Sequence, residues 1–189
     1  MGLFSGQKLS QTRLIGDFEY PKYGLYWVRI DKVKQGKTRK QEMHLVIEYT
    51  VVKVLPHQEP PPNHLVGDEA GHFIMVSGSD YAQADWVGFV TSMFGCKVEE
   101  LDSPEVKALC GGMEIDDWAT NEDPAKGVVQ PMRGMIGEMK NRLQMTKDKP
   151  GDPSHPFTRI RWCRQVPMDE VLKNIPAEDA KKFFPTPAA

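Results

Sequence analysis

Two neighbouring stretches of β-type sequence, joined by a basic turn, constrain the fold of this chain more than any other feature. Residues 42–55, EMHLVIEYTVVKVL, alternate between apolar and polar side chains, as a half-buried strand does. The apolar face comprises Met43, Leu45, Ile47, Tyr49 and Val51, and the opposite face carries His44, Glu48 and Thr50. The preceding residues 24–33, GLYWVRIDKV, are rich in β-branched and aromatic side chains. Because Gly36 lies in the connection between them, the pattern predicts a long β-hairpin.

The connection in this hairpin has an unusual charge. Residues 29–40 carry six basic side chains and one acidic side chain, in a chain whose formal net charge is -2. Residues 126–164 carry nine basic and three acidic side chains, whereas residues 97–123 carry nine acidic side chains and two lysines. Charge is therefore segregated along the chain, and the net charge is a poor guide to its partners.

The other elements follow from turn and capping signals. Residues 56–64, PHQEPPPNH, are expected to form a loop because prolines give no backbone donors. A short strand is expected at 72–78, an amphipathic helix at 79–95 and a short helix at 103–112. Residues 157–166, FTRIRWCRQV, are typical of a strand, and 167–175 and 176–184 are typical of short helices with proline in the first turn.

The segment RGMIGEMKNRLQMT, residues 133–146, is ambiguous, because most of its residue types favour helices. Its side chains nevertheless alternate, with Gly137, Met139 and Asn141 on one side and Glu138, Lys140 and Arg142 on the other. Two interior glycines would weaken a helix by roughly 1 kcal/mol each. We therefore expect a strand, which forms a second, positively charged hairpin with residues 157–166.

This order of elements predicts a mainly β fold with helices, in the α+β class. Five short, mostly antiparallel strands with a helix between the third and fourth match the layout of an OB-fold, a five-stranded Greek-key barrel. The expected organisation is an N-terminal arm at 1–22, an OB-fold-like domain at 23–166 and a C-terminal helical tail at 167–189.

Several classes of protein are disfavoured. Cys96, Cys110 and Cys163 are odd in number and widely spaced, which signals neither a disulfide framework nor a zinc site. The histidines are scattered, and no phosphate-binding loop, dinucleotide fingerprint or nucleophile elbow occurs. We expect a protein without catalysis, cofactor or metal. No leader or membrane-length apolar stretch occurs, so the expected location is the cytoplasm.

Three segments, in this order, resemble the OB-fold single-stranded-DNA-binding proteins encoded by bacteriophages. They are GLYWVRIDKVKQGKTRKQEMHLVIEYTVV, DYAQADWVGFVTSMFG and PAKGVVQPMRGMIGEMKNRLQMTKDKPGDPSHPFTRIRW. The resemblance spans residues 23–166 and rests on the order of the elements and on the TK and FTRIRW signals of the last hairpin. Many such proteins end in an acidic tail that recruits replication partners, but AEDAKKFFPTPAA has two acids and two lysines. The resemblance therefore does not imply that this chain recruits replication partners through an acidic tail.

Single-stranded DNA needs a positive groove for its phosphates and aromatic faces for its bases. In an OB-fold the loops of both hairpins flank the binding face. The candidates in the first hairpin are Arg29, Lys32, Lys34, Lys37, Arg39 and Lys40. Those in the second are Lys140, Arg142, Lys147, Arg159 and Arg161, with Arg164 beside them.

The aromatic candidates are Tyr26, Trp27 and Trp162. Tyr26 and Trp27 are adjacent in a strand and point to opposite faces, so we expect only one of them in the core. Trp162 is either a half-buried barrel residue or a stacking platform.

The leading hypothesis is a non-catalytic protein that coats single-stranded DNA in phage replication or recombination, largely without sequence preference. Further partners considered are a second copy of the chain and replication or recombination proteins, and no membrane is expected. A lysine-rich hairpin has a simpler explanation, as a soluble edge that resists aggregation. The acidic residues 99–123 are either a solvated surface or a mimic of DNA. The alternative function is a virion or tail component that uses a β-barrel for protein contacts.

Overall fold

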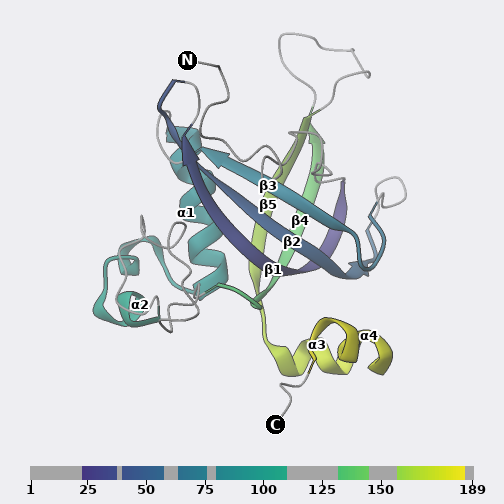
Figure 1. The fold of residues 1–189 in the computed structure, drawn as a ribbon. Coiled ribbons are helices and arrows are strands. Elements are labelled where there is room, and N and C mark those ends of the chain that lie inside the picture. Colours follow the sequence, from purple (N-terminus) through teal and green to yellow (C-terminus); the bar gives the residue numbers. More distant parts are fainter. Residues whose placement is uncertain are drawn as a thin grey trace, which may run out of the picture.

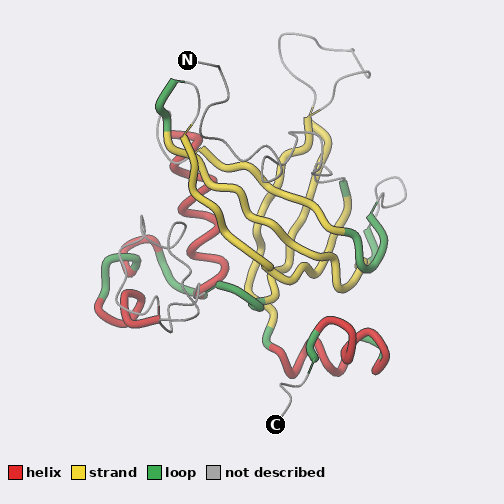
Figure 2. The backbone as a smooth tube through the Cα atoms, in the orientation of Figure 1, coloured by secondary structure: helices red, strands yellow, loops and turns green. Residues whose placement is uncertain are grey.

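The computed structural model describes residues 23–37, 40–57, 64–75, 80–109, 132–144 and 157–185 (Figures 1 and 2). The expected N-terminal arm at 1–22 lies outside these residues, as do most of the proline loop and residues 110–131, which include the second half of the acidic segment. The proposed domain boundaries remain predictions.

One antiparallel sheet of five strands, in the order β3-β2-β1-β4-β5, forms the centre of the described structure. The strands are β1 (Gly24–Lys37), β2 (Met43–Leu55), β3 (Glu69–Met75), β4 (Ile136–Gln144) and β5 (Phe157–Val166). The helices are α1 (Asp80–Phe94), α2 (Pro104–Leu109), α3 (Met168–Asn174) and α4 (Ala177–Phe183), and a short 3-10 turn spans Val98–Glu100. The predicted α+β class is confirmed.

The predicted elements are present, with shifted boundaries. The ambiguous segment is a strand, but it begins at Ile136 because residues 132–134 form a turn in which Gly134 has φ +81°. β1 continues past Val33 to Lys37, where it is still paired with Met43 of β2. β3 begins at Glu69 rather than His72, since Thr50 of β2 still pairs with Glu69.

The sheet is strongly curved, and a side-chain contact links its two edge strands. Register shifts in β1, between Trp27 and Val28 and between Ile30 and Lys32, mark irregularities that increase the twist. The indole Nε1 of Trp162 on β5 donates a hydrogen bond to Nδ1 of His72 on β3 at 3.2 Å, and the two rings stack. We call this line of approach between β3 and β5 the seam. The curved sheet is compatible with a barrel.

The main core lies between the concave face of the sheet and α1. The sheet contributes Tyr26, Val28, Ile30, Leu45, Ile47, Tyr49, Val51, Ile74, Met139 and Trp162, and α1 contributes Trp86, Phe89, Val90 and Met93. The predicted apolar faces of 42–55 and 79–95 are confirmed for these residues. Gly137 permits close packing here, because a Cβ at this position would lie 2.8 Å from the Trp162 ring and 2.9 Å from the Met93 sulfur.

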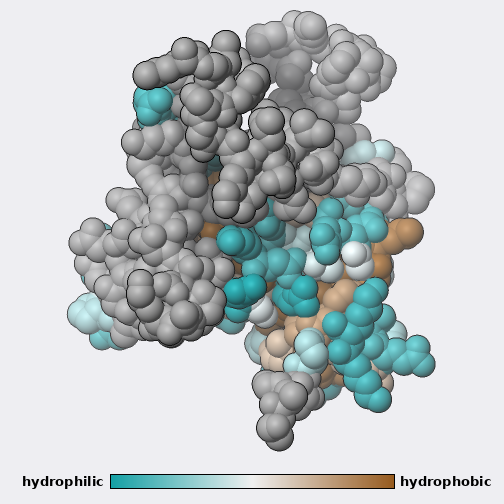
Figure 3. Space-filling view, in the orientation of Figure 1, coloured by the Kyte–Doolittle hydropathy of each residue, from teal (hydrophilic) through white to brown (hydrophobic). Residues whose placement is uncertain are grey.

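A second, smaller core lies on the other face of the sheet, under the C-terminal helices (Figure 1). It consists of Trp27, Val52, Ile136 and Val166 from the sheet and Val171, Ile175 and Phe183 from the helical segment. Figure 3 shows hydrophilic residues over the middle of the visible face and more hydrophobic residues below them, next to these helices. α3 and α4 are therefore packed parts of the fold.

Candidate nucleic-acid interface

The convex face of β1, β2 and β3 carries an aromatic pair close to its hairpin end. His44 on β2 and Phe73 on β3 stack with their ring centroids 4.6 Å apart and an interplanar angle of 28°. Phe73 is 49% exposed, although a large apolar side chain gains free energy from burial. Burial lowers the pKa of His44 and so favours its neutral ring. The His44 ring covers one face of the Phe73 ring and leaves the other as an exposed aromatic surface, and we call this stacked pair the platform.

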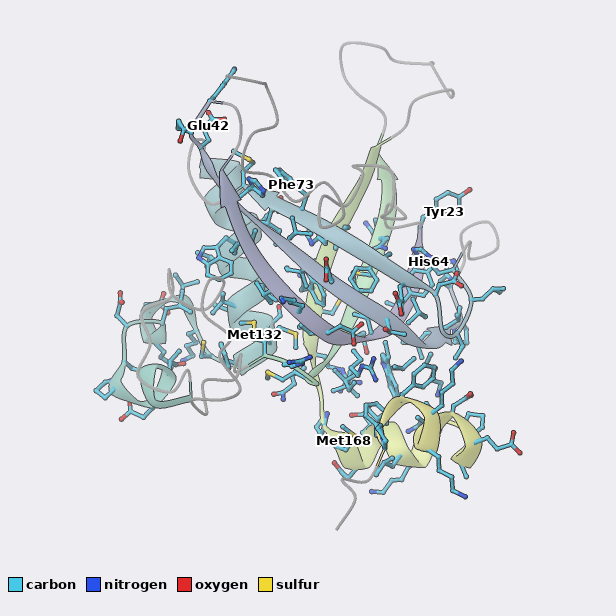
Figure 4. The ribbon with its side chains drawn as sticks, in the orientation of Figure 1. Tyr23, Glu42, His64, Phe73, Met132 and Met168 are labelled. Carbon is cyan, nitrogen blue, oxygen red and sulfur yellow. The ribbon has the colours of Figure 1, made fainter. Side chains whose placement is uncertain are left out.

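The backbone register explains why these two side chains meet. Val46 of β2 pairs with Phe73, and His44 pairs with Met75, so His44 and Phe73 are diagonal neighbours on one face. Their sequence neighbours Leu45, Ile47 and Ile74 face the core. Figure 4 shows Phe73 toward the same end of the sheet as Glu42, and far from Met168 at the start of α3.

The first basic hairpin adjoins the platform in the sheet. Lys34 pairs with Val46 and Gly36 pairs with His44, so both lie in the same cross-strand rows as the platform. Lys40 is exposed and Lys32 is half-buried, opposite Glu48. The side chains of Lys34 and Lys37, and the whole of Arg39, lie outside the described structure.

The opposite end of this convex face carries both signs of charge. A cavity of about 550 Å³ between the sheet and the end of α4 is lined by three acidic side chains, Asp31, Glu48 and Glu69, and by two arginines, Arg29 and Arg133. Arg29 lies in the same cavity, but its guanidinium is held by Asp31 at 2.6 Å and donates a hydrogen bond to the carbonyl of Phe183. Arg29 therefore anchors α4 to the sheet, and its guanidinium is engaged by the protein itself.

The three aromatic candidates are buried. Tyr26 is fully buried in the main core, and Trp27 is 4% exposed in the second core. The expectation that only one of this pair is core is wrong, because α3 and α4 cover the face to which Trp27 points. Trp162 is also a core residue and packs against Phe89 with ring centroids 4.8 Å apart. None of the three presents a ring to a base in this structure.

The second hairpin brings three basic candidates together with α1. Lys140 and Arg142 of β4 and Arg161 of β5 line a groove of about 780 Å³. Its other wall is α1, through Asp85, Gly88 and Ser92 among others. Lys140 pairs with Arg161 in the sheet, and Arg142 pairs with Arg159, whose side chain is not described. Lys147 lies outside the described residues.

Arg164 has a structural role instead. Its guanidinium donates to both carboxylate oxygens of Glu170 on α3, at 2.8 and 2.6 Å, and also contacts Glu138 at 3.2 Å. These hydrogen bonds raise the pKa of Arg164 and lower the pKa of Glu170. Glu138 also accepts a hydrogen bond from the Trp27 indole, so the network links both strands of the hairpin to the second core.

The described part of the chain contains no cluster of histidine, cysteine and acidic side chains that could hold a metal ion. None of the helices described is both long enough and apolar enough to cross a lipid bilayer.

A comparison with protein-family models finds no match, and a comparison with curated protein sequences finds none either.

Sequence reasoning missed the platform. The alternation of 42–55 placed His44 on the polar face, but nothing marked it as one half of a ring pair. In HFIMVSG, residues 72–78, Phe73 stands between His72 and Ile74, and composition alone allows either Phe73 or Ile74 to be the core residue. The structure buries Ile74, orients His72 toward Trp162 and leaves Phe73 outside. If Ile74 is taken as a core residue, the alternation of side chains along a strand predicts that Phe73 points away from the core.

Proposed function

We propose that this protein binds single-stranded DNA without catalysis, and that the bases stack on the platform formed by His44 and Phe73. The observation that carries the proposal is the exposed, stacked ring pair on a sheet face next to a basic hairpin. Duplex DNA hides its base faces, whereas a single strand can lay them on an aromatic surface.

The strand order supports an OB-fold as the scaffold. In that fold a five-stranded Greek-key barrel binds oligonucleotides on the face of strands 2 and 3. The order β3-β2-β1-β4-β5, with α1 between β3 and β4 and the contact between His72 and Trp162 across the seam, is compatible with such a barrel. The platform would then lie on its binding face. The resemblance to phage proteins gives DNA replication or recombination as the setting.

The charge distribution gives the expected position of the strand on this face. At the end near α4 three carboxylates outnumber two arginines, and Arg29 is already paired with Asp31, so phosphates should be attracted more strongly to the basic hairpin at the platform end. Bound DNA should therefore cross the hairpin end of the convex face.

A titration of labelled oligo-dT, followed by fluorescence anisotropy at several salt concentrations, tests the proposal. We expect binding that weakens as salt rises, because phosphate contacts release counterions, and weaker competition by duplex than by single-stranded DNA. Phe73→Leu keeps the apolar bulk but removes the ring, and should weaken binding roughly 5- to 150-fold, the equivalent of roughly 1–3 kcal/mol for one stacked base.

Leu172→Ala is the matched control, because Leu172 on α3 is 50% exposed and apolar but lies far from the platform. It should leave affinity unchanged. If the wild-type protein does not bind oligo-dT, or binds it regardless of salt, the proposed function is wrong. If the wild type and Phe73→Leu bind oligo-dT with equal affinity, the platform is not part of the binding site.

A further inference from the structure

The groove between α1 and the second hairpin contains an arrangement that a sheet normally avoids. Lys140 of β4 lies directly opposite Arg161 of β5, and two residues further along Arg142 lies opposite Arg159. Like charges in directly opposed positions destabilise a sheet. The same two strands also contain a pair of opposite charges, because Glu138 lies opposite Arg164 and the two form an ion pair.

The positive charges of the groove are not neutralised by the described protein. Lys140, Arg142 and Arg161 make no ion pair within the described residues, whereas Arg29 and Arg164 are held by carboxylates. Asp85 on α1 is the acidic side chain among the lining residues described. Unfavourable local features of this kind are expected at functional sites, where a ligand compensates for them. The ligand indicated here is an anion with repeated charges.

The groove is also open enough for a polymer. It has a volume of about 780 Å³, and the space above Gly88 is open, with no atom within 4 Å of a Cβ built there. Ser92 does not compete for a ligand, because its hydroxyl already donates to the carbonyl of Trp162. The α1 wall is thus mostly small side chains facing a cationic wall.

The groove and the platform flank the same seam. The contact between His72 and Trp162 joins β3 to β5, and Phe73 and Arg161 are the immediate sequence neighbours of these two residues. Because successive side chains of a strand point to opposite faces, Phe73 and Arg161 both point outward. Phe73 and Arg161 therefore lie on either side of the contact between His72 and Trp162.

We propose that this groove holds the phosphate backbone of the same DNA strand whose bases stack on the platform, so that one strand crosses the seam. This inference rests on the proposed function and extends it. Short oligonucleotides reach only the platform, and longer ones occupy both surfaces. The platform supplies selectivity for unpaired bases, and the groove supplies length-dependent and salt-dependent affinity.

The test compares oligo-dT of increasing length on the wild type and on the double variant Lys140→Gln/Arg161→Gln. We expect the variant to match the wild type on the shortest oligomer that binds, and to lose at least about tenfold in affinity on long ones. Each lost phosphate contact removes about 0.7 from the slope of log affinity against log salt, so the slope should fall by about 1.4. Without DNA, the variant should melt at the same or a higher temperature, since it removes a like-charge pair.

Lys173→Gln/Lys181→Gln is the control, because it makes the same change in net charge on exposed positions of α3 and α4. It should change neither the length dependence nor the slope beyond a small, uniform loss. If the wild type binds long oligo-dT and the groove variant binds it with the same affinity and slope, the groove is not part of the site and the platform proposal stands. If the wild type binds no oligo-dT of any length, both proposals fail.

Discussion

At the scale of single residues, His72 makes the fold sensitive to acid. Its Nδ1 accepts the hydrogen bond from the Trp162 indole, so that nitrogen carries no proton in the native state. Burial lowers the pKa of His72 to about 4. The neutral ring is therefore a structural requirement of the seam.

We expect the free energy of unfolding to fall as the pH falls from about 6.5 to about 4. In this window the unfolded chain binds a proton at His72 and the native state does not, so acid favours unfolding. The loss is at most about 3 kcal/mol, because each unit between the two pKa values corresponds to about 1.36 kcal/mol. Urea unfolding at several pH values measures it.

His72→Asn provides the control for this effect. Asparagine can offer an oxygen acceptor to the Trp162 indole but does not titrate. The variant should lose a large part of the pH dependence between 4 and 6.5. The assignment would be contradicted if its stability followed the same pH curve as the wild type.

Two glycines give opposite expectations for the same substitution. Gly137→Ala places a methyl group 2.8 Å from the Trp162 ring and should destabilise the protein by about 1–3 kcal/mol through overpacking. Gly88→Ala in α1 meets no atom within 4 Å and should stabilise it by up to about 1 kcal/mol, because alanine is the better helix former. Thermal or chemical denaturation measures both effects. The described packing would be contradicted if Gly88→Ala destabilised the protein, or if Gly137→Ala did not.

At the scale of elements, α3 and α4 are each only two turns long and depend on the sheet for their stability. Two interactions besides the second core hold them: Arg29 with the carbonyl of Phe183, and Arg164 with Glu170. Arg29 of β1 thus holds α4, and Arg164 of β5 holds α3. Among the described cations, Arg29 and Arg164 thus stabilise the fold, whereas Lys140, Arg142 and Arg161 in the groove form no ion pair with the described residues.

We expect Phe183→Ala to cost about 3–5 kcal/mol, as removal of a buried phenylalanine ring usually does. Leu172→Ala, on the exposed side of α3, should change stability by less than about 0.5 kcal/mol. Equilibrium unfolding in urea compares them. Equal, small effects would mean that α4 does not share a core with the sheet.

Most elements could be predicted from the sequence, because alternation and capping are local signals. The strand at β4 was predictable despite its helix-forming residues, since Gly137, Met139 and Asn141 face the core together. The end of β1 and the start of β3 could not be predicted from the sequence. Both boundaries are determined by pairing with β2 and not by the residue types of β1 and β3 themselves. The burial of Trp27 was missed because it depends on helices that begin at the far end of the sequence.

At the scale of the whole molecule, the candidate site could be predicted in part. The cations of both hairpins were expected beside one groove. Lys140, Arg142 and Arg161 of the second hairpin line a groove with α1, whereas the first hairpin adjoins the platform. Their position beside α1 follows from the curvature of the sheet, which no short segment encodes. The structural roles of Arg29 and Arg164 could not be predicted either, because they depend on carboxylate partners that only the fold brings to them.

The central place of β1 has a consequence for how the protein is made. Leu25 pairs with Leu55 on one side and with Lys140 on the other, so the second edge of β1 is covered by a strand from much later in the sequence. While the ribosome is still translating that later part, the nascent hairpin has Trp27 uncovered and one row of backbone groups unpaired. Such an edge recruits chaperones or wrong strands. Productive folding is therefore delayed until β4 emerges from the ribosome, long after β1 and β2.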